Sequence, residues 1–152
     1  MSAGGGREQL QQLSQELQAI EAEIEAMDTE IAETRQEQSD IDEAIDALER
    51  LETGSTVQVP LGGGAYVRAE VTDIDEVIVS LGGDYAAEQE QEAAVESLER
   101  KQDTLDDRIG ELRDEKTELE EESEELEQRA QQMQQQLQQQ QMQQMQQMRD
   151  DE

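Results

Sequence analysis

The sequence contains no cysteine, no histidine, no phenylalanine and no tryptophan, and it has a single proline, Pro60. Without cysteine, the chain has no disulfide bond, thiolate nucleophile or cysteine-based metal site. Without histidine, Ser-His and Cys-His nucleophilic systems are excluded. Large aromatic side chains dominate most globular cores, so their scarcity argues against an ordinary packed globule.

Positive charge is also scarce. Lysine and arginine number 11 against 41 aspartate and glutamate residues, for a formal net charge of -30. This balance disfavours binding to nucleic acids or anionic membranes, because such binding requires cationic side chains. Such an excess repels itself in dilute salt, but at molar salt the Debye length falls to about 3 Å. Together with only two lysines, Lys101 and Lys116, this predicts a protein of a halophile; a merely acidic protein is the alternative.

No signal-peptide pattern and no apolar run of about 20 residues occurs, so a soluble, cytoplasmic protein is expected. The chain does contain two seams whose steps alternate between three and four residues. The first seam consists of Leu10, Leu13, Leu17, Ile20, Ile24, Met27, Ile31, Thr34, Gln38, Ile41, Ile45 and Leu48. The second consists of Val95, Leu98, Gln102, Leu105, Ile109, Leu112, Lys116, Leu119, Ser123, Leu126, Ala130, Met133 and Leu137. This repeat predicts two supercoiled helices, over residues 7–53 and 89–140.

Residues 55–88 have a different pattern, with β-branched runs separated by glycines. The pattern predicts strands over residues 56–61, 65–71 and 76–81, and a short fourth strand over 84–88. The fold class is therefore α+β. One domain over residues 1–152 is expected to form a long antiparallel two-helix coiled coil, with two β-hairpins between the helices at its closed end. Four short strands cannot bury both faces alone, so the module is expected to assemble with equivalent modules in an oligomer.

The helices are expected to close near residues 52 and 87, which places Gln38 opposite Gln102, each a polar break in its seam. Paired amides would fix the register of the coil, since an unmatched buried amide costs about 1–3 kcal/mol. The alternative is that each amide is solvated at the edge of a thin coil.

No pattern indicates catalysis, a metal or another cofactor. The glycine runs at 62–64 and 82–83 do not continue into Gly-Lys-Ser/Thr, so they predict hairpin turns rather than phosphate loops. Asp103, Asp106 and Asp107 are interpreted as a solvated helix face rather than a cation site. No EF-hand pattern occurs.

The C-terminal part is unusual because residues 130–148 carry no charge. It is rich in glutamine and contains Met142, Met145 and Met148, which lie beyond the seam. Methionine adapts to partners of many shapes, and promiscuous binding surfaces use it for this reason. The stretch is interpreted as a surface that binds unfolded polypeptides. The alternative is a disordered low-complexity tail, and residues 141–152 are expected to be flexible.

The stretch Val57–Glu88, with its VPLGGGAYV and VIVSLGGDYAAE segments, resembles archaeal prefoldin α subunits. The likeness covers roughly residues 10–126, and two hairpins rather than one favour the α type over the β type. The resemblance implies an ATP-independent chaperone, a hexamer of two α and four β subunits whose hairpins form a double β-barrel platform. Unfolded polypeptides would be held at the coil tips and passed to a group II chaperonin in the cytoplasm.

The resemblance also assigns roles to residues of this sequence. The implied assembly contacts are Val57, Val59, Leu61, Val67, Val71, Val77, Val79 and Leu81. The implied polypeptide contacts are Leu10, Leu13, Leu17, Met133 and Leu137, whereas the role of the three later methionines depends on composition alone. The rival functions are a coiled-coil adaptor for one defined partner and an acidic mimic of nucleic acid.

Overall fold

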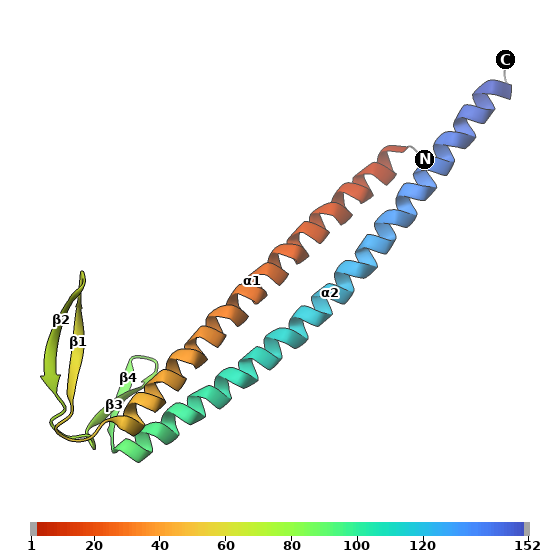
Figure 1. Cartoon of the computed structure of the whole chain (residues 1–152). Coiled ribbons are helices and arrows are strands. Elements are labelled where there is room, and N and C mark those ends of the chain that lie inside the picture. Colours follow the sequence, from red (N-terminus) through yellow and green to blue (C-terminus); the bar gives the residue numbers. More distant parts are fainter. Residues whose placement is uncertain (1–2, 151–152) are drawn as a thin grey trace. The chain divides into compact units, whose positions relative to one another are not determined.

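The computed structural model describes residues 3–150 and contains two long helices with two antiparallel β-hairpins between them (Figure 1), which confirms the predicted fold class. The elements are α1 (Ala3–Arg50), β1 (Thr56–Gly62), β2 (Ala65–Glu70), β3 (Val77–Gly82), β4 (Tyr85–Gln89) and α2 (Gln91–Asp150). Helix α2 continues through residues 141–150, which were expected to form a flexible tail; the rest of that tail, residues 151–152, lies outside the described residues. Glutamine and methionine are good helix formers, and this segment contains no glycine or proline to end the helix.

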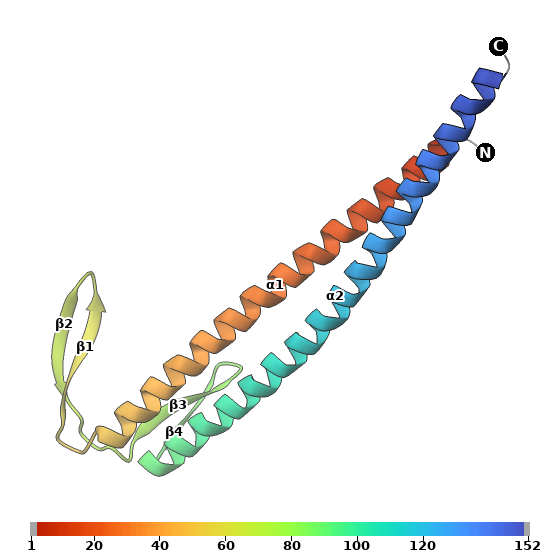
Figure 2. The ribbon, with the colours of Figure 1, turned by 45° about the vertical axis from the view of Figure 1, so that its right-hand side comes forward.

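The chain divides into two compact units. The terminal unit comprises residues 1–31 and 110–152, and the hairpin unit comprises residues 32–109. Within each unit α1 and α2 run antiparallel and side by side (Figures 1 and 2). Polar contacts join the two helices in each: Asp28 with Lys116 in the terminal unit, and Gln38 with Gln102 in the hairpin unit.

The seam forms the core, as predicted. Every residue of both predicted seams is buried or half-buried, whereas most helical residues outside the seams are exposed. Leu112 is the most enclosed large side chain, at 1% exposure. Because two helices offer only one line of mutual contact, the interior of the coil is a single row of interlocking side chains.

Gln38 and Gln102 form the predicted register contact. The side-chain amide of Gln38 donates to the backbone oxygen of Gln102 at 3.3 Å and to Asp106 at 2.5 Å. The amide of Gln102 donates in turn to the backbone oxygen of Gln38 at 3.3 Å and to Asp42. Each glutamine thus reaches the carboxylate one helical turn beyond its counterpart. Each amide is therefore hydrogen-bonded across the coil, to backbone and carboxylate oxygens rather than to the other amide.

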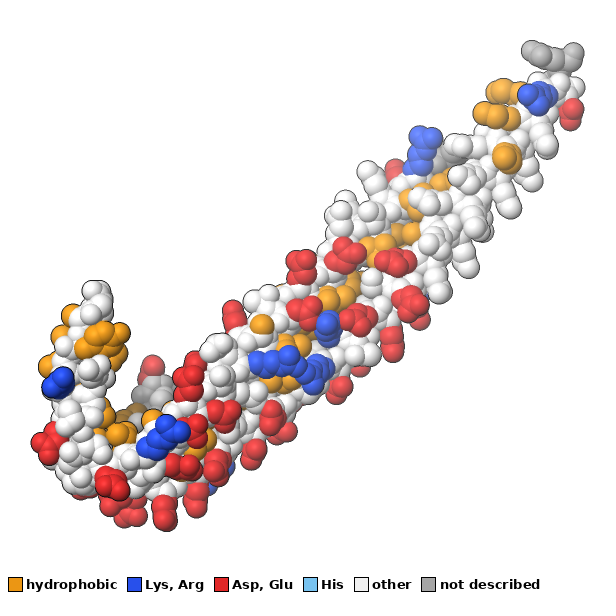
Figure 3. Space-filling model, viewed as in Figure 1, with side chains coloured by type: hydrophobic (Ala, Val, Ile, Leu, Met, Phe, Trp, Pro, Cys, Tyr) orange, Lys and Arg blue, Asp and Glu red, His pale blue; other side chains and the backbone are white. Residues whose placement is uncertain are grey.

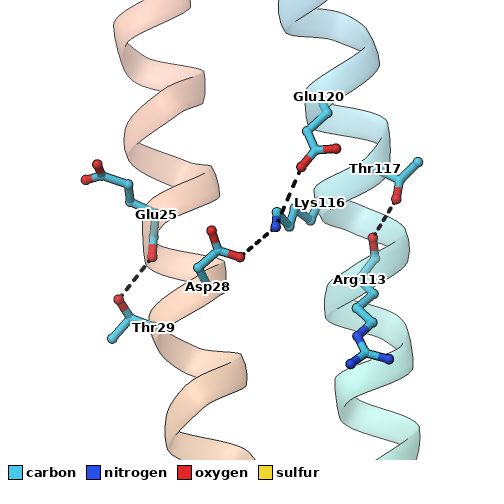
Figure 4. Close-up of polar contacts among 7 residues, drawn as sticks. All are labelled: Glu25, Asp28, Thr29, Arg113, Lys116, Thr117 and Glu120. Carbon is cyan, nitrogen blue, oxygen red and sulfur yellow. Dashed lines mark hydrogen bonds and ion pairs between the residues drawn. The ribbon is translucent and has the colours of Figure 1, made fainter.

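In the terminal unit, residues of α2 contact residues of α1 that lie about one helical turn later than the predicted register gives. Lys116 contacts Asp28 (Figure 4), and a Cβ added to Gly6 would lie 2.8 Å from the Leu137 Cδ2 atom. Side chains in a helix lean toward its N-terminus. The N-terminal end of α2 lies beside the C-terminal end of α1, so side chains of α2 lean toward later residues of α1. The predicted register counted backbone positions only and did not include this lean.

The two hairpins have the same construction. In each, the strand register shifts at a glycine, Gly62 or Gly82, whose φ is 97° or 96°. The turn then passes through two residues with positive φ, Gly63 and Gly64 in the first hairpin and Gly83 and Asp84 in the second. Two consecutive positive φ angles are typical of the tight turns that match strand twist. A shared V-x-V-x-L-G-G pattern, at 57–63 and 77–83, accounts for this equivalence.

The hairpins differ in packing. Val79 of β3 is 5% exposed, and Ala94 and Ser97 of α2 are 0% and 4% exposed. A side-chain contact from Ser97 to Gln89, at 2.8 Å, also joins the second hairpin to α2. In contrast, no residue of β1 or β2 is buried. The first hairpin therefore leaves both its faces open to a partner.

Candidate functional site

The charge-free stretch of α2 lies in the terminal unit. From residue 138 to 150 every side chain is exposed. Met142, Met145 and Met148, here called the methionine stripe, are 71%, 71% and 77% exposed. Figure 3 shows this end of α2 with hydrophobic side chains and few acidic ones, whereas acidic side chains cover much of the rest of the helices. The structure thus presents an uncharged apolar surface on a strongly acidic molecule.

The methionine stripe is out of phase with the seam. Continuing the three-four steps of the seam beyond Leu137 leads to residues 140, 144 and 147, which are all glutamine. The methionines occupy other positions, and their three-residue spacing places neighbours on one side of the helix. All three side chains are exposed in the structure, so they stay available to another molecule.

Two shallow grooves lie in the terminal unit, and the second adjoins the stripe. The first, of about 340 Å³, is lined by residues of both helices that include Leu13 and Met133. The second, of about 270 Å³, is lined by Arg7, Leu137 and five glutamines of α2. The structure thus brings together Leu13 and Met133, two of the predicted polypeptide contacts. Leu10, Leu13, Leu17, Met133 and Leu137 are all half-buried in the seam, so each offers only an edge to the grooves.

One lysine, Lys116, forms ion pairs within the terminal unit. Lys116 occupies a seam position, and its ammonium group donates to Asp28 at 2.8 Å and lies 3.6 Å from Glu120 (Figure 4). The hydrogen bond to Asp28 raises the pKa of Lys116, aided by the charges of both carboxylates and opposed by desolvation. Sequence reasoning missed this pair because Asp28 lies beside the seam, not in it. Among the described residues, no three carboxylates are grouped as a metal site would require.

The predicted assembly residues form a second candidate site, on the hairpins. Val59 pairs with Val67, and Val57 with Ala69, so one face of the first hairpin is apolar. Val59, Leu61 and Val67 are 40%, 68% and 47% exposed. Of the remaining five predicted residues, Val57, Val71 and Val77 are half-buried, Leu81 is 48% exposed and Val79 is buried.

On the second hairpin, the two faces of β3 differ in exposure. Val79 is enclosed by its own chain and has little area left for a partner. Ile78, on the opposite face of β3, is 74% exposed. Sequence reasoning missed Ile78, although the alternation of side chains along a strand places it opposite Val77 and Val79. Tyr66 and Tyr85 are also exposed.

Known proteins share this arrangement of coil and hairpins. A family model described as "Prefoldin subunit" matches residues 20–148. The chain belongs to the prefoldin subunit family. It is 73% identical over 108 residues to prefoldin subunit alpha of Halorubrum lacusprofundi, covering 71% of each chain. It is 67% identical over 106 residues to prefoldin subunit alpha of Halobacterium salinarum, covering 70% of this chain and 69% of the relative.

A solved prefoldin is similar in structure. The chain aligns with filamentous PFD from Methanocaldococcus jannaschii, determined by cryo-electron microscopy, with a TM-score of 0.51 and 31% identity. The alignment covers 78% of this chain and 95% of that one. The chain is thus a prefoldin-type chaperone subunit, and its halophilic relatives support the interpretation of its acidic composition. Among the described helices, none has an apolar stretch long and uncharged enough to span a lipid bilayer.

Proposed function

We propose that the chain is a subunit of an ATP-independent, non-enzymatic chaperone that holds unfolded polypeptides at the open end of its coil, in the cytoplasm. The complex would contain two subunits of this α type and four of the β type, and would deliver its cargo to a group II chaperonin. The observation that carries the proposal is the methionine stripe: three exposed thioethers within an uncharged helical stretch, on a chain of charge -30.

The chemistry of this stretch suits an unfolded chain. Methionine is unbranched and polarizable, so it can pack against apolar side chains of many shapes. The flanking glutamine amides each donate and accept hydrogen bonds, which matches the unpaired N–H and C=O groups of an extended backbone. Because no ionised group has to be desolvated, binding should be insensitive to salt. Such a surface recognises non-native structure rather than one sequence.

The half-buried tip residues have a secondary role in this proposal. Leu13 and Met133 line one groove, and Leu137 lines the other. Their exposed edges would extend the apolar surface of the methionine stripe toward α1. Leu10 and Leu17 lie in the same seam and would contribute further area if the helix ends part.

The test is light scattering of a chemically unfolded protein diluted into molar salt, in the presence of the chain co-purified with its β-type partner. The triple variant M142Q/M145Q/M148Q extends the natural glutamine tract, so it removes the thioethers while keeping good helix formers. We expect this variant to lose most of the suppression of aggregation. The matched control, M142L/M145L/M148L, keeps the apolar area and should retain it.

Two outcomes would contradict the proposal. If wild-type complex fails to suppress aggregation of several unrelated proteins, the chain does not act as a general holdase, and an adaptor for one defined partner becomes the better interpretation. If the glutamine variant holds cargo as well as wild type, the site lies elsewhere on the complex.

Assembly through the hairpins is the second part of the proposal, and the open first hairpin supports it. An isolated two-stranded hairpin is at best marginally stable, yet the apolar face with Val59 and Val67 has no covering element. Val59→Asp should prevent co-purification with the β-type partner while leaving the helical circular dichroism signal intact. Gln58→Asp, on the opposite face of the same strand, is the control. Equal loss of assembly in both variants would argue against this face.

A further inference from the structure

Every apolar side chain in the last turns of α2 contains sulfur. Between Leu137 and Asp150 the only apolar side chains are those of the methionine stripe, and the rest are glutamine or charged. The three thioethers are 71%, 71% and 77% exposed, whereas Met27 and Met133 are half-buried in the seam. The chain has no cysteine, so no thiol of its own competes for an oxidant. Among the methionines that the structure describes, an oxidant from solvent would therefore reach these three first.

The chemistry that follows is specific to thioethers. A peroxide transfers one oxygen atom to the methionine sulfur: the O–O bond breaks, an S–O bond forms, and water or an alcohol leaves. Sulfur loses two electrons and the peroxide gains them. The product, methionine sulfoxide, is polar, and sulfoxide reductases convert it back to the thioether at the expense of a dithiol. Oxidation would therefore replace the apolar surface of this segment with a polar one, reversibly.

We propose that Met142, Met145 and Met148 are a reversible oxidation site that switches off polypeptide binding under peroxide stress. This inference depends on the proposed holdase function, because it assigns regulation to the same surface. The seam methionines, Met27 and Met133, act as internal references because their partial burial slows their oxidation. The coil should remain folded, since every residue from 138 to 150 is exposed and lies outside the buried seam.

The experiment treats the co-purified complex with a limiting amount of hydrogen peroxide. Peptide mass spectrometry should show one added oxygen on each methionine of the stripe before Met27 or Met133 reacts. Retention of an unfolded cargo should weaken by roughly tenfold, as expected for loss of apolar contact area of this size. Circular dichroism should not change. Treatment with methionine sulfoxide reductases and a dithiol should restore retention.

The variant M142L/M145L/M148L separates the possible causes. It carries no sulfur in the stripe, so its own retention, measured before and after the same treatment, should not change, even though Met1, Met27 and Met133 remain. The proposed switch is refuted if oxidised wild type holds cargo as well as untreated wild type. It is also refuted if peroxide removes the same fraction of the leucine variant's own retention as of the wild type's. Failure of untreated wild type to hold cargo would instead refute the holdase function itself.

Discussion

The reciprocal glutamine contact offers the sharpest quantitative test of the coil. Replacement of Gln38 by methionine, which is close in shape, removes hydrogen bonds to the backbone oxygen of Gln102 and to Asp106. Replacement of Gln102 removes the equivalent bonds to Gln38 and Asp42. A typical intramolecular hydrogen bond contributes about 0.5–1.5 kcal/mol net. Both side chains are half-buried, so water can replace part of the lost hydrogen bonding. The free energy of unfolding of each single variant should therefore fall by about 1–2 kcal/mol.

The double variant Q38M/Q102M should recover part of this loss, because two methionines can pack together in an otherwise apolar seam. We expect a coupling energy of about 1 kcal/mol from a double-mutant cycle. The assay is urea unfolding of the chain in molar salt, followed by circular dichroism at helical wavelengths. The double variant should also show a broader distribution of spin-label distances between α1 and α2, since a polar seam pair specifies register. A coupling energy below about 0.3 kcal/mol, with unchanged distances, would refute the assignment of register to this pair.

Three further results are expected. Gly110→Ala should raise the free energy of unfolding by about 1 kcal/mol, because Gly110 is helical and exposed and the added Cβ would meet nothing within 4 Å beyond its chain neighbours and the local helix backbone. Gly64→Ala, at a φ of 81°, should lower the free energy of unfolding, and a gain in both variants would contradict this argument. The raised pKa of Lys116 predicts a stabilising contribution that is fully present below its ordinary value of 10.5 and is lost as pH rises through the raised value; thermal melts of wild type and Lys116→Met at pH 9 to 12 should therefore converge, and a constant gap would count against the Asp28 contact. Transfer from molar salt to about 10 mM lengthens the Debye length to about 30 Å, so the chain should lose helical signal, and full stability there would show that its acidity is not an adaptation to salt.

The seams and hairpins could be predicted because each follows a local period. The three-four spacing of the seams is matched position by position in the burial of the helices. The Gln38–Gln102 contact could be predicted because two polar breaks in facing seams leave few alternatives. In contrast, Val79 and Val59 occupy equivalent places in a repeated pattern, yet one is enclosed and the other open. Tertiary packing of one hairpin against α2 decides this difference, and no property of the strand sequence encodes it.

The candidate site also has features that could be predicted from the sequence and features that could not. The absence of charge and the methionine content were visible in the sequence, and they located the stripe. Its helical conformation was not expected, because a glutamine-rich tract has no apolar period to indicate an ordered helix. The Lys116–Asp28 contact was also missed, since it depends on the direction in which a long side chain leans across the coil.

The single-row interior of the coil has a consequence for how such subunits can change. Because each heptad contacts only its counterpart across the seam, seven residues inserted in α1 and seven at the facing point of α2 would leave every other contact intact. The coil would lengthen by about 10 Å at 1.5 Å per residue. An insertion in one helix alone, or of a length that is not a multiple of seven, would misalign the seam beyond that point. Evolution can therefore vary the reach of this chaperone arm, but only in matched steps of one heptad.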